Sequence, residues 1–132
     1  MIVVDSSVLV SLLRGTETKG SQALESILKA EIDFGIPAPC LQEILQGARD
    51  AKEFKVIDTF LSKQKLLIPK DINSYREAAK IAFDCRRVGK TIRSSIDCLI
   101  AQLTLEINGV LLHEDKDFFA VQRVRPLKFL LY

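Results

Sequence analysis

Acidic residues stand at three separate places in this sequence where an apolar segment meets a polar one. Asp5 follows the first short apolar run, Asp97 opens a helical pattern, and Asp115 and Asp117 follow a later apolar run. Two carboxylates about 4 Å apart repel by about 4 kcal/mol at an effective dielectric constant near 20. Acids that share one site therefore raise each other's pKa values or bind a cation. Carboxylates without thiolate or imidazole favour hard ions, here Mg²⁺ or Mn²⁺.

The elements that must position these acids alternate along the chain. Short apolar runs predict strands at residues 2–4, 34–36, 66–68, 110–112 and 127–130. Apolar periodicity and capping signals predict helices at residues 6–13, 18–30, 37–48, 51–62, 72–88, 94–107 and 118–122. This alternation predicts an α/β fold, a three-layer α/β/α domain over residues 1–132 around a parallel sheet of about four to five strands.

Such a sheet would gather the acids at one edge. The carboxyl ends of parallel strands and the amino ends of the following helices share an edge, and ligands bind there. Asp5, Asp97 and the pair Asp115 and Asp117 would all reach this edge. The positive ends of the helix dipoles tolerate anions there, phosphate included.

Each acid also has a purely structural interpretation. Asp5 could simply cap the helix that starts at Ser6. Asp97 lies three residues after Ser94, which resembles a capping box, and Arg93 stands at i, i+4 spacing from it.

The later acids have similar alternatives. Asp115 or Asp117 could cap the short helix at Phe118, and Glu43 lies off the apolar face of its helix, as a surface residue would. A residue that lines a solvent-filled cleft would lie off that face too. The joint placement of the acids is a stronger signal than any one of them.

Composition and motifs exclude several other classes. The chain has 132 residues, 48% hydrophobic and 27% charged, with a formal net charge of +2, as in an ordinary globular protein. The first residues lack the basic region of a signal peptide, and charges interrupt every long apolar run, so we expect a cytoplasmic protein without a membrane span. Three widely spaced cysteines, Cys40, Cys85 and Cys98, suit buried free thiols rather than disulfides or zinc ligands.

The sequence contains no G-x-S-x-G elbow, Cys–His couple or Walker loop. It also lacks the paired acids of a response-regulator receiver and the Asp-x-Asp of a haloacid-type phosphatase after the first strand. Metal-dependent phosphodiester chemistry is the reaction class that remains.

Four motifs follow one another along the chain. They are Ile-Val-Val-Asp-Ser-Ser from residue 2, Glu-Ile-Leu-Gln-Gly from residue 43, Ile-Arg-Ser-Ser-Ile-Asp-Cys-Leu-Ile-Ala from residue 92, and Leu-Leu-His-Glu-Asp-Lys-Asp-Phe from residue 111. In this order they resemble the motifs of the PIN-domain nucleases, specifically the VapC-type toxins of toxin–antitoxin pairs. The resemblance covers essentially the whole chain. It implies a PIN-like domain and an Mg²⁺- or Mn²⁺-dependent endoribonuclease.

The resemblance also implies roles for individual residues. Asp5, Glu43, Asp97 and Asp115 would be catalytic and would ring the metal, with Asp117 as an alternative to Asp115.

Three further positions belong to the same comparison. Ser7 would orient the acids, and Arg93 would orient Asp97 or contact substrate phosphate. His113 is a departure, because the family usually has Thr there, and we expect it to change the hydrogen bonding behind the site without loss of activity.

Partners follow from the resemblance as well. We expect an RNA substrate, such as a tRNA or another structured RNA, a homodimer, and a VapB-type antitoxin whose helix lies in an apolar groove. The early leucines Leu9, Leu12 and Leu13 are candidate groove residues, although leucines at such positions more often belong to the core. The alternatives are a housekeeping PIN nuclease that needs no antitoxin and a noncatalytic PIN-like binding module.

A basic stretch leads into the helix that carries Asp97. It consists of Arg86, Arg87, Lys90 and Arg93. Ordinary solvation of a helix end explains these charges, and so does a track for RNA phosphates beside the metal. The sequence shows no aromatic stacking platform that would indicate base specificity.

Overall fold

The computed structural model describes residues 1–131 and contains a five-stranded sheet in which every neighbouring pair is parallel. The strands are β1 (Ile2–Val4), β2 (Phe34–Pro37), β3 (Lys65–Leu67), β4 (Val110–Leu112) and β5 (Lys128–Phe129). Their order across the sheet is β3-β2-β1-β4-β5. The predicted parallel α/β sheet is confirmed.

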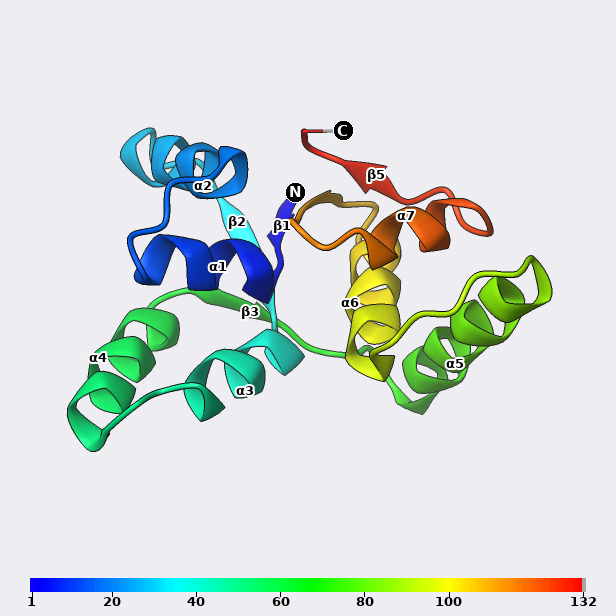
Figure 1. Ribbon diagram of the computed structural model, residues 1–132, viewed down its shortest axis with the longest axis horizontal. Coiled ribbons are helices and arrows are strands. Elements are labelled where there is room, and N and C mark those ends of the chain that lie inside the picture. The colour runs from blue at the N-terminus through cyan, green and yellow to red at the C-terminus, as the bar shows by residue number, and fades with distance from the viewer. Residues whose placement is uncertain (132) are drawn as a thin grey trace.

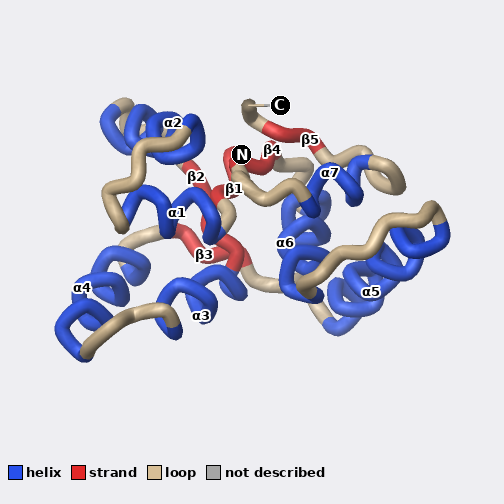
Figure 2. The backbone as a smooth tube through the Cα atoms, viewed as in Figure 1, coloured by secondary structure: helices blue, strands red, loops and turns tan. Residues whose placement is uncertain are grey.

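Seven helices connect the strands within the described residues. They are α1 (Ser6–Leu13), α2 (Lys19–Lys29), α3 (Ala38–Gln46), α4 (Ala51–Ser62), α5 (Ile72–Arg87), α6 (Ser95–Glu106) and α7 (Asp117–Gln122). Helices α1 to α4 lie on the left of the view and α5 to α7 on the right, with β1 between the two groups and β5 beside α7 (Figures 1 and 2). The predicted helices are all present, with ends that differ by at most two residues.

The order of the strands reverses between β1 and β4. From β1 the chain runs outward through β2 to β3 and then crosses back to place β4 on the other side of β1. Connections that leave two adjacent strands in opposite directions open a crevice at their carboxyl ends, where α/β proteins bind ligands. Ile2 of β1 pairs with Val110 of β4, and Val4 pairs with Leu112. The Asp5 amide continues this ladder by donating to the Leu112 carbonyl at 3.0 Å. Asp5 is therefore fixed at the carboxyl ends of β1 and β4, where the strand order reverses.

The interior is apolar on both sides of the central strands. Val3, Val4, Leu111 and Leu112 are fully buried, which is expected for parallel strands covered on both faces. The third strand differs from the expectation of a buried run. It lies at the edge of the sheet, starts one residue earlier than predicted, and leaves Ile68 72% exposed just beyond its end.

The buried, free cysteines agree with the sequence interpretation. No helix within residues 1–131 has both the length and the apolarity needed to cross a membrane.

Gly35 lets β2 and β3 approach each other, and its replacement tests this packing. A Cβ at this position would lie 2.9 Å from Leu67 Cγ, so we expect Gly35→Ala to lower the free energy of unfolding by about 1–3 kcal/mol through overpacking. Urea denaturation measures the change. Gly47→Ala is the matched control, because the nearest atom to its new Cβ would be the Ile44 carbonyl oxygen at 3.4 Å, an ordinary contact distance. Equal stability of the two variants would contradict the close packing of β2 on β3.

Candidate metal centre

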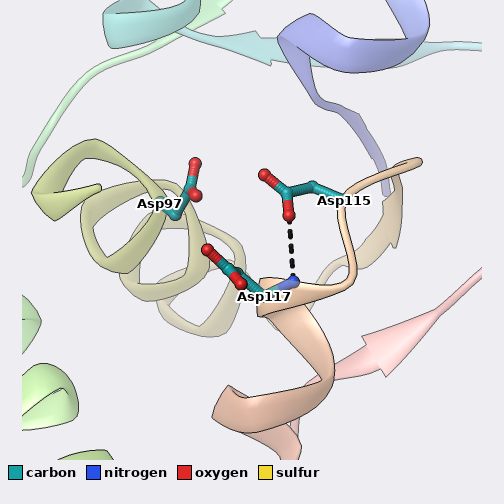
Figure 3. A group of neighbouring side chains, drawn as sticks. All are labelled: Asp97, Asp115 and Asp117. Carbon is teal, nitrogen blue, oxygen red and sulfur yellow. Dashed lines mark hydrogen bonds between the residues drawn. The ribbon is translucent and has the colours of Figure 1, made fainter. Parts of the chain in front are cut away.

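Three carboxylates converge from two helices and the loop between β4 and α7. Asp97 lies in the first turn of α6, Asp117 is the first residue of α7, and Asp115 lies in the loop just before it. One oxygen from each lies within 4.8 Å of the others. Figure 3 shows the three carboxylates facing a common space. Because all the ligand atoms are hard oxygens, the triad can bind a divalent metal ion.

Local hydrogen bonds fix the loop that carries Asp115. Its Oδ1 accepts the amide of Asp117 at 2.9 Å, and its own amide donates to His113 Nδ1 at 3.2 Å. Asp115 therefore bonds the first amide of α7, although the N-cap residue of this helix is Lys116, which has no side-chain cap hydrogen bond. His113 is buried among Phe118, Phe119 and Phe129, and burial lowers its pKa to about 4. A neutral imidazole that accepts at Nδ1 serves this loop.

Asp5 is a helix cap that lies outside the group of three carboxylates, but its charge raises the pKa of Asp97. It is only 3% exposed, and its Oδ2 accepts the Ser7 amide at 3.1 Å and the Ser7 hydroxyl at 2.5 Å. The Cys40 thiol lies 4.0 Å from Oδ1. The capping and site interpretations of Asp5 are therefore compatible.

Glu43 completes the acidic surroundings from α3. It accepts a hydrogen bond from the Ser6 hydroxyl at 2.9 Å, and its negative charge raises the pKa values of both Asp5 and Asp97. Its place off the apolar face of α3 therefore turns it toward the site.

The electrostatics show how unfavourable this gathering is without a cation. Burial raises the pKa of Asp97 to about 7, and the negative charges of Asp115, Asp5 and Glu43 add to the rise. Burial likewise raises the pKa of Asp5 to about 6, although the hydrogen bonds from Ser7 oppose it. A divalent cation would offset this repulsion.

The structural alternatives for Asp97 are not realised. The Ser94 hydroxyl accepts a hydrogen bond from the amide of Ile96 rather than from that of Asp97. Arg93 pairs with Asp117, at 3.2 Å from its Nε to Asp117 Oδ2, instead of forming the i, i+4 pair with Asp97. The sequence interpretation that Arg93 orients Asp97 therefore differs from the contact in the structure.

Two positions next to the acids escaped the sequence interpretation. Ser6 holds Glu43, and Cys40 contacts Asp5. Cys40 precedes Glu43 by three residues on α3, so helical spacing could have placed both on one face. Ser6 had no comparable signal, because its partner is 37 residues away.

Comparison with known proteins identifies the family to which this fold belongs. The family model described as "PIN domain" matches residues 2–124. The chain belongs to the PIN-domain family. It is 31% identical over 129 residues to a protein named "VapC ribonuclease Mb1587" from Mycobacterium bovis, covering 97% of this chain and 96% of that protein.

Solved structures show the same fold. VapBC2 from Rickettsia felis, bound to a DNA fragment from its promoter, superposes with a TM-score of 0.75 at 19% identity, covering 98% of this chain and 97% of the other. A toxin–antitoxin complex from Klebsiella pneumoniae superposes with a TM-score of 0.70 at 16% identity, covering 98% and 100%.

The raised pKa of Asp97 predicts that replacing this residue by a neutral one stabilises the protein, by an amount that depends on pH. Between about pH 4 and 7 the folded protein keeps a proton on Asp97 that the unfolded chain loses near its ordinary pKa of 3.8, so this acid lowers stability progressively as pH rises. In the metal-free protein, Asp97→Asn should raise the free energy of unfolding by about 1–3 kcal/mol at pH 8, and by less at pH 5.

Urea denaturation at both pH values measures this difference. Asp33→Asn is the control, because Asp33 is exposed just before β2 and so lies at the amino end of that strand, whereas the acids lie at the carboxyl ends. His113 is present in all three proteins, so the destabilisation caused by protonation of this buried imidazole at low pH is common to them and cancels in the comparison. A variant at position 97 less stable than the parent at pH 8 would contradict the repulsion.

Proposed function

We propose that this chain is a divalent-metal-dependent endoribonuclease that acts as the toxin of a VapBC-type toxin–antitoxin pair. The observation that carries the proposal is the convergence of Asp97, Asp115 and Asp117 within 4.8 Å, beside the buried Asp5. The ribonuclease name of the relative at 31% identity supports the activity. The domain is proposed to span residues 1–132 and to act in the cytoplasm.

The donor set fits Mg²⁺ or Mn²⁺. Five carboxylates supply hard oxygens, and two of them have pKa values raised by burial and mutual repulsion, which is the electrostatic condition that a dication relieves. We propose Asp5, Asp97 and Asp115 as the principal ligands, with Glu43 and Asp117 completing the set. When bound, the ion would activate water and stabilise the charge that develops on the phosphate.

The chain's own residues would keep this site ordered and accessible. Ser7 holds Asp5 through its amide and its hydroxyl, and Ser6 holds Glu43. Arg93 is 71% exposed in its side chain beside Asp117, so its guanidinium is free on one side to contact a substrate phosphate. In this proposal Arg93 both pairs with an acid and binds RNA.

The basic stretch extends this contact away from the acids. Arg86, Arg87 and Lys90 are exposed at the end of α5 and in the turn that follows, and the Arg87 guanidinium lies 5.8 Å from the centre of the Phe83 ring. Exposed cations in a row bind phosphates regardless of sequence. We propose a structured RNA, such as a tRNA, as the substrate, recognised by its shape.

Cleavage of RNA by the purified protein tests the activity directly. We expect Mg²⁺ or Mn²⁺ to support cleavage and EDTA to stop it. Asp97→Asn should lower the rate by more than about 100-fold, because loss of a residue that only hydrogen-bonds to a metal ligand already costs about 10- to 100-fold. Asp33→Asn should cleave as the parent does. Sequencing the cut ends of cellular RNA after a short pulse of expression would identify the target. Cleavage that survives EDTA would refute the metal mechanism.

An apolar groove next to the site suits an antitoxin helix. It has a volume of about 600 Å³ and lies between α1, α3 and α4, lined by Val10, Leu13, Arg14, Glu43, Ile44, Gly47, Arg49, Glu53, Val56 and Ile57. Glu43 belongs both to the groove and to the acidic surroundings, so a helix in the groove could bring a basic side chain to the acids. The neighbours solved as VapBC and toxin–antitoxin complexes support such a partner.

The three candidate groove leucines differ in the structure. Leu13 is 39% exposed and lines the groove, Leu12 is partly buried against the core, and Leu9 is fully buried in it. Core packing therefore explains Leu9. A homodimer also remains part of the proposal, and exposed apolar side chains near the start of α5, Ile68, Ile72 and Tyr75, offer surface for a second copy.

A charge placed in the groove tests the antitoxin site. Val56 is 62% exposed, and we expect Val56→Glu to weaken capture by a VapB-type antitoxin by about 10-fold or more, with RNA cleavage unchanged. Pull-down with the co-expressed antitoxin and a cleavage assay measure the two effects. Ile107→Glu, 41% exposed at the other end of α6, is the control and should be neutralised normally. Equal capture of both variants would place the antitoxin elsewhere.

A further inference from the structure

Glu114 is an acid beside the metal site that turns away from it. It comes one residue before Asp115 in the loop between β4 and α7, and it is partly buried. Its Oε2 accepts a hydrogen bond from the Ser11 hydroxyl at 3.0 Å, and its Oε1 accepts one from the Thr18 hydroxyl. Ser11 belongs to α1, and Thr18 is the N-cap of α2. The side chain thus ties the metal-site loop to the connection between two helices over 95 residues earlier.

The main chain of Glu114 makes a second link to the same helix. Its amide donates to the Ser7 hydroxyl at 3.0 Å, and that hydroxyl in turn donates to Asp5 Oδ2 at 2.5 Å. One hydroxyl therefore joins the loop of Asp115 to Asp5. Glu114 is held from both its backbone and its side chain, so little freedom remains for the residue that follows it.

Gly20 shows that the space around this carboxylate is specific. It is buried in the first turn of α2, and a Cβ built on it would collide with Glu114 Oε1. A glycine normally weakens a helix relative to alanine. The absent side chain at position 20 therefore provides room for the Glu114 carboxylate.

The charge of Glu114 is satisfied outside the acidic cluster. Two hydroxyl donors and the amino end of α2 stabilise it, and a helix amino end favours a negative charge. Asp115, the next residue, has its carboxylate toward Asp97 and Asp117 (Figure 3). Two adjacent acids in one loop thus have different partners, one on α2 and one at the proposed metal.

We propose that Glu114 is a positioning residue of the metal site: by anchoring its loop to Ser11 and Thr18, it holds Asp115 where the ion is bound. The inference rests on the proposed function, because it concerns the ion of that site. It assigns to Glu114 no contact with metal or RNA. A residue of this kind acts on the geometry of a ligand, and loss of such outer partners typically lowers metal affinity about 10- to 100-fold.

Titration of the folded protein with Mn²⁺ alone tests the proposal. We expect Glu114→Ala to raise the Mn²⁺ dissociation constant by about 10-fold or more, and Glu114→Gln, which keeps one acceptor oxygen, to give a smaller rise. The cleavage rate at saturating RNA should fall in the same order. Glu17→Ala is the matched control, because it removes the same charge from an exposed position next to Thr18 and should bind Mn²⁺ as the parent does.

Gly20→Ala keeps the test decisive if Glu114→Ala folds poorly. A purely structural effect of this change would be a more stable α2 with unaltered Mn²⁺ affinity, whereas displacement of the Glu114 carboxylate should weaken Mn²⁺ binding. If Gly20→Ala acts by displacing the Glu114 carboxylate, it should have less effect once that carboxylate is replaced by a neutral amide that binds Ser11 and Thr18 less strongly. In a Glu114→Gln background, Gly20→Ala should therefore weaken Mn²⁺ binding by a smaller factor than in the parent.

The outcomes separate this inference from the function it rests on. A parent protein that binds Mn²⁺ and cleaves RNA, with folded Glu114 and Gly20 variants of unchanged Mn²⁺ affinity, would overturn the inference alone. A parent that neither binds Mn²⁺ nor cleaves RNA would overturn both.

Discussion

Repulsion between carboxylates that the sheet brings together is the constraint on which the rest of this structure depends. The reversal of strand order between β1 and β4 places Asp5 and Asp115 at the carboxyl ends of these strands, and the first turn of α6 adds Asp97. Neither burial nor proximity favours ionised acids, as the raised pKa values of Asp5 and Asp97 show. The apolar core must therefore stabilise a site that is unfavourable until a cation binds.

Local hydrogen bonds at the starts of two helices reduce the free-energy cost of holding these acids together. Ser7 donates twice to Asp5 at the start of α1, and the amide of Asp117 donates to Asp115 at the start of α7. The two hydrogen bonds from Ser7 favour the ionised form of Asp5. Both arrangements also supply a partner to a helix end that would otherwise lack one. Capping and metal binding are thus one arrangement here. This is why weighing them as alternatives for Asp5 and Asp115 from the sequence left the question open.

The elements were predictable because local signals and burial agree along most of this chain. The β-branched run at residues 2–4 and the short apolar run at residues 110–112 fix their strands locally. The glycine at position 89, which follows α5 with φ of +79°, fixes the end of that helix. The partners of the site residues depend on contacts between distant segments. Arg93 was expected beside Asp97 by helical spacing, yet it pairs with Asp117, 24 residues away, because the residues before α6 lie against the start of α7. No local pattern encodes such a contact, and the bond from Ser6 to Glu43 is of the same kind.

The placement of cations around the site is as informative as that of the acids. Arg93 contacts the cluster through Asp117, and its guanidinium is largely exposed, so solvent screens the pair and its neutralising effect on the buried acids is small. Asp97 and Asp5 keep raised pKa values despite this arginine. A buried arginine at the same place would have formed a closed ion pair and left the acids no need for a metal. The exposed arginine instead leaves the negative charge at the acids and places a positive group where an RNA phosphate would approach, so the same site can attract a metal ion and an anionic substrate.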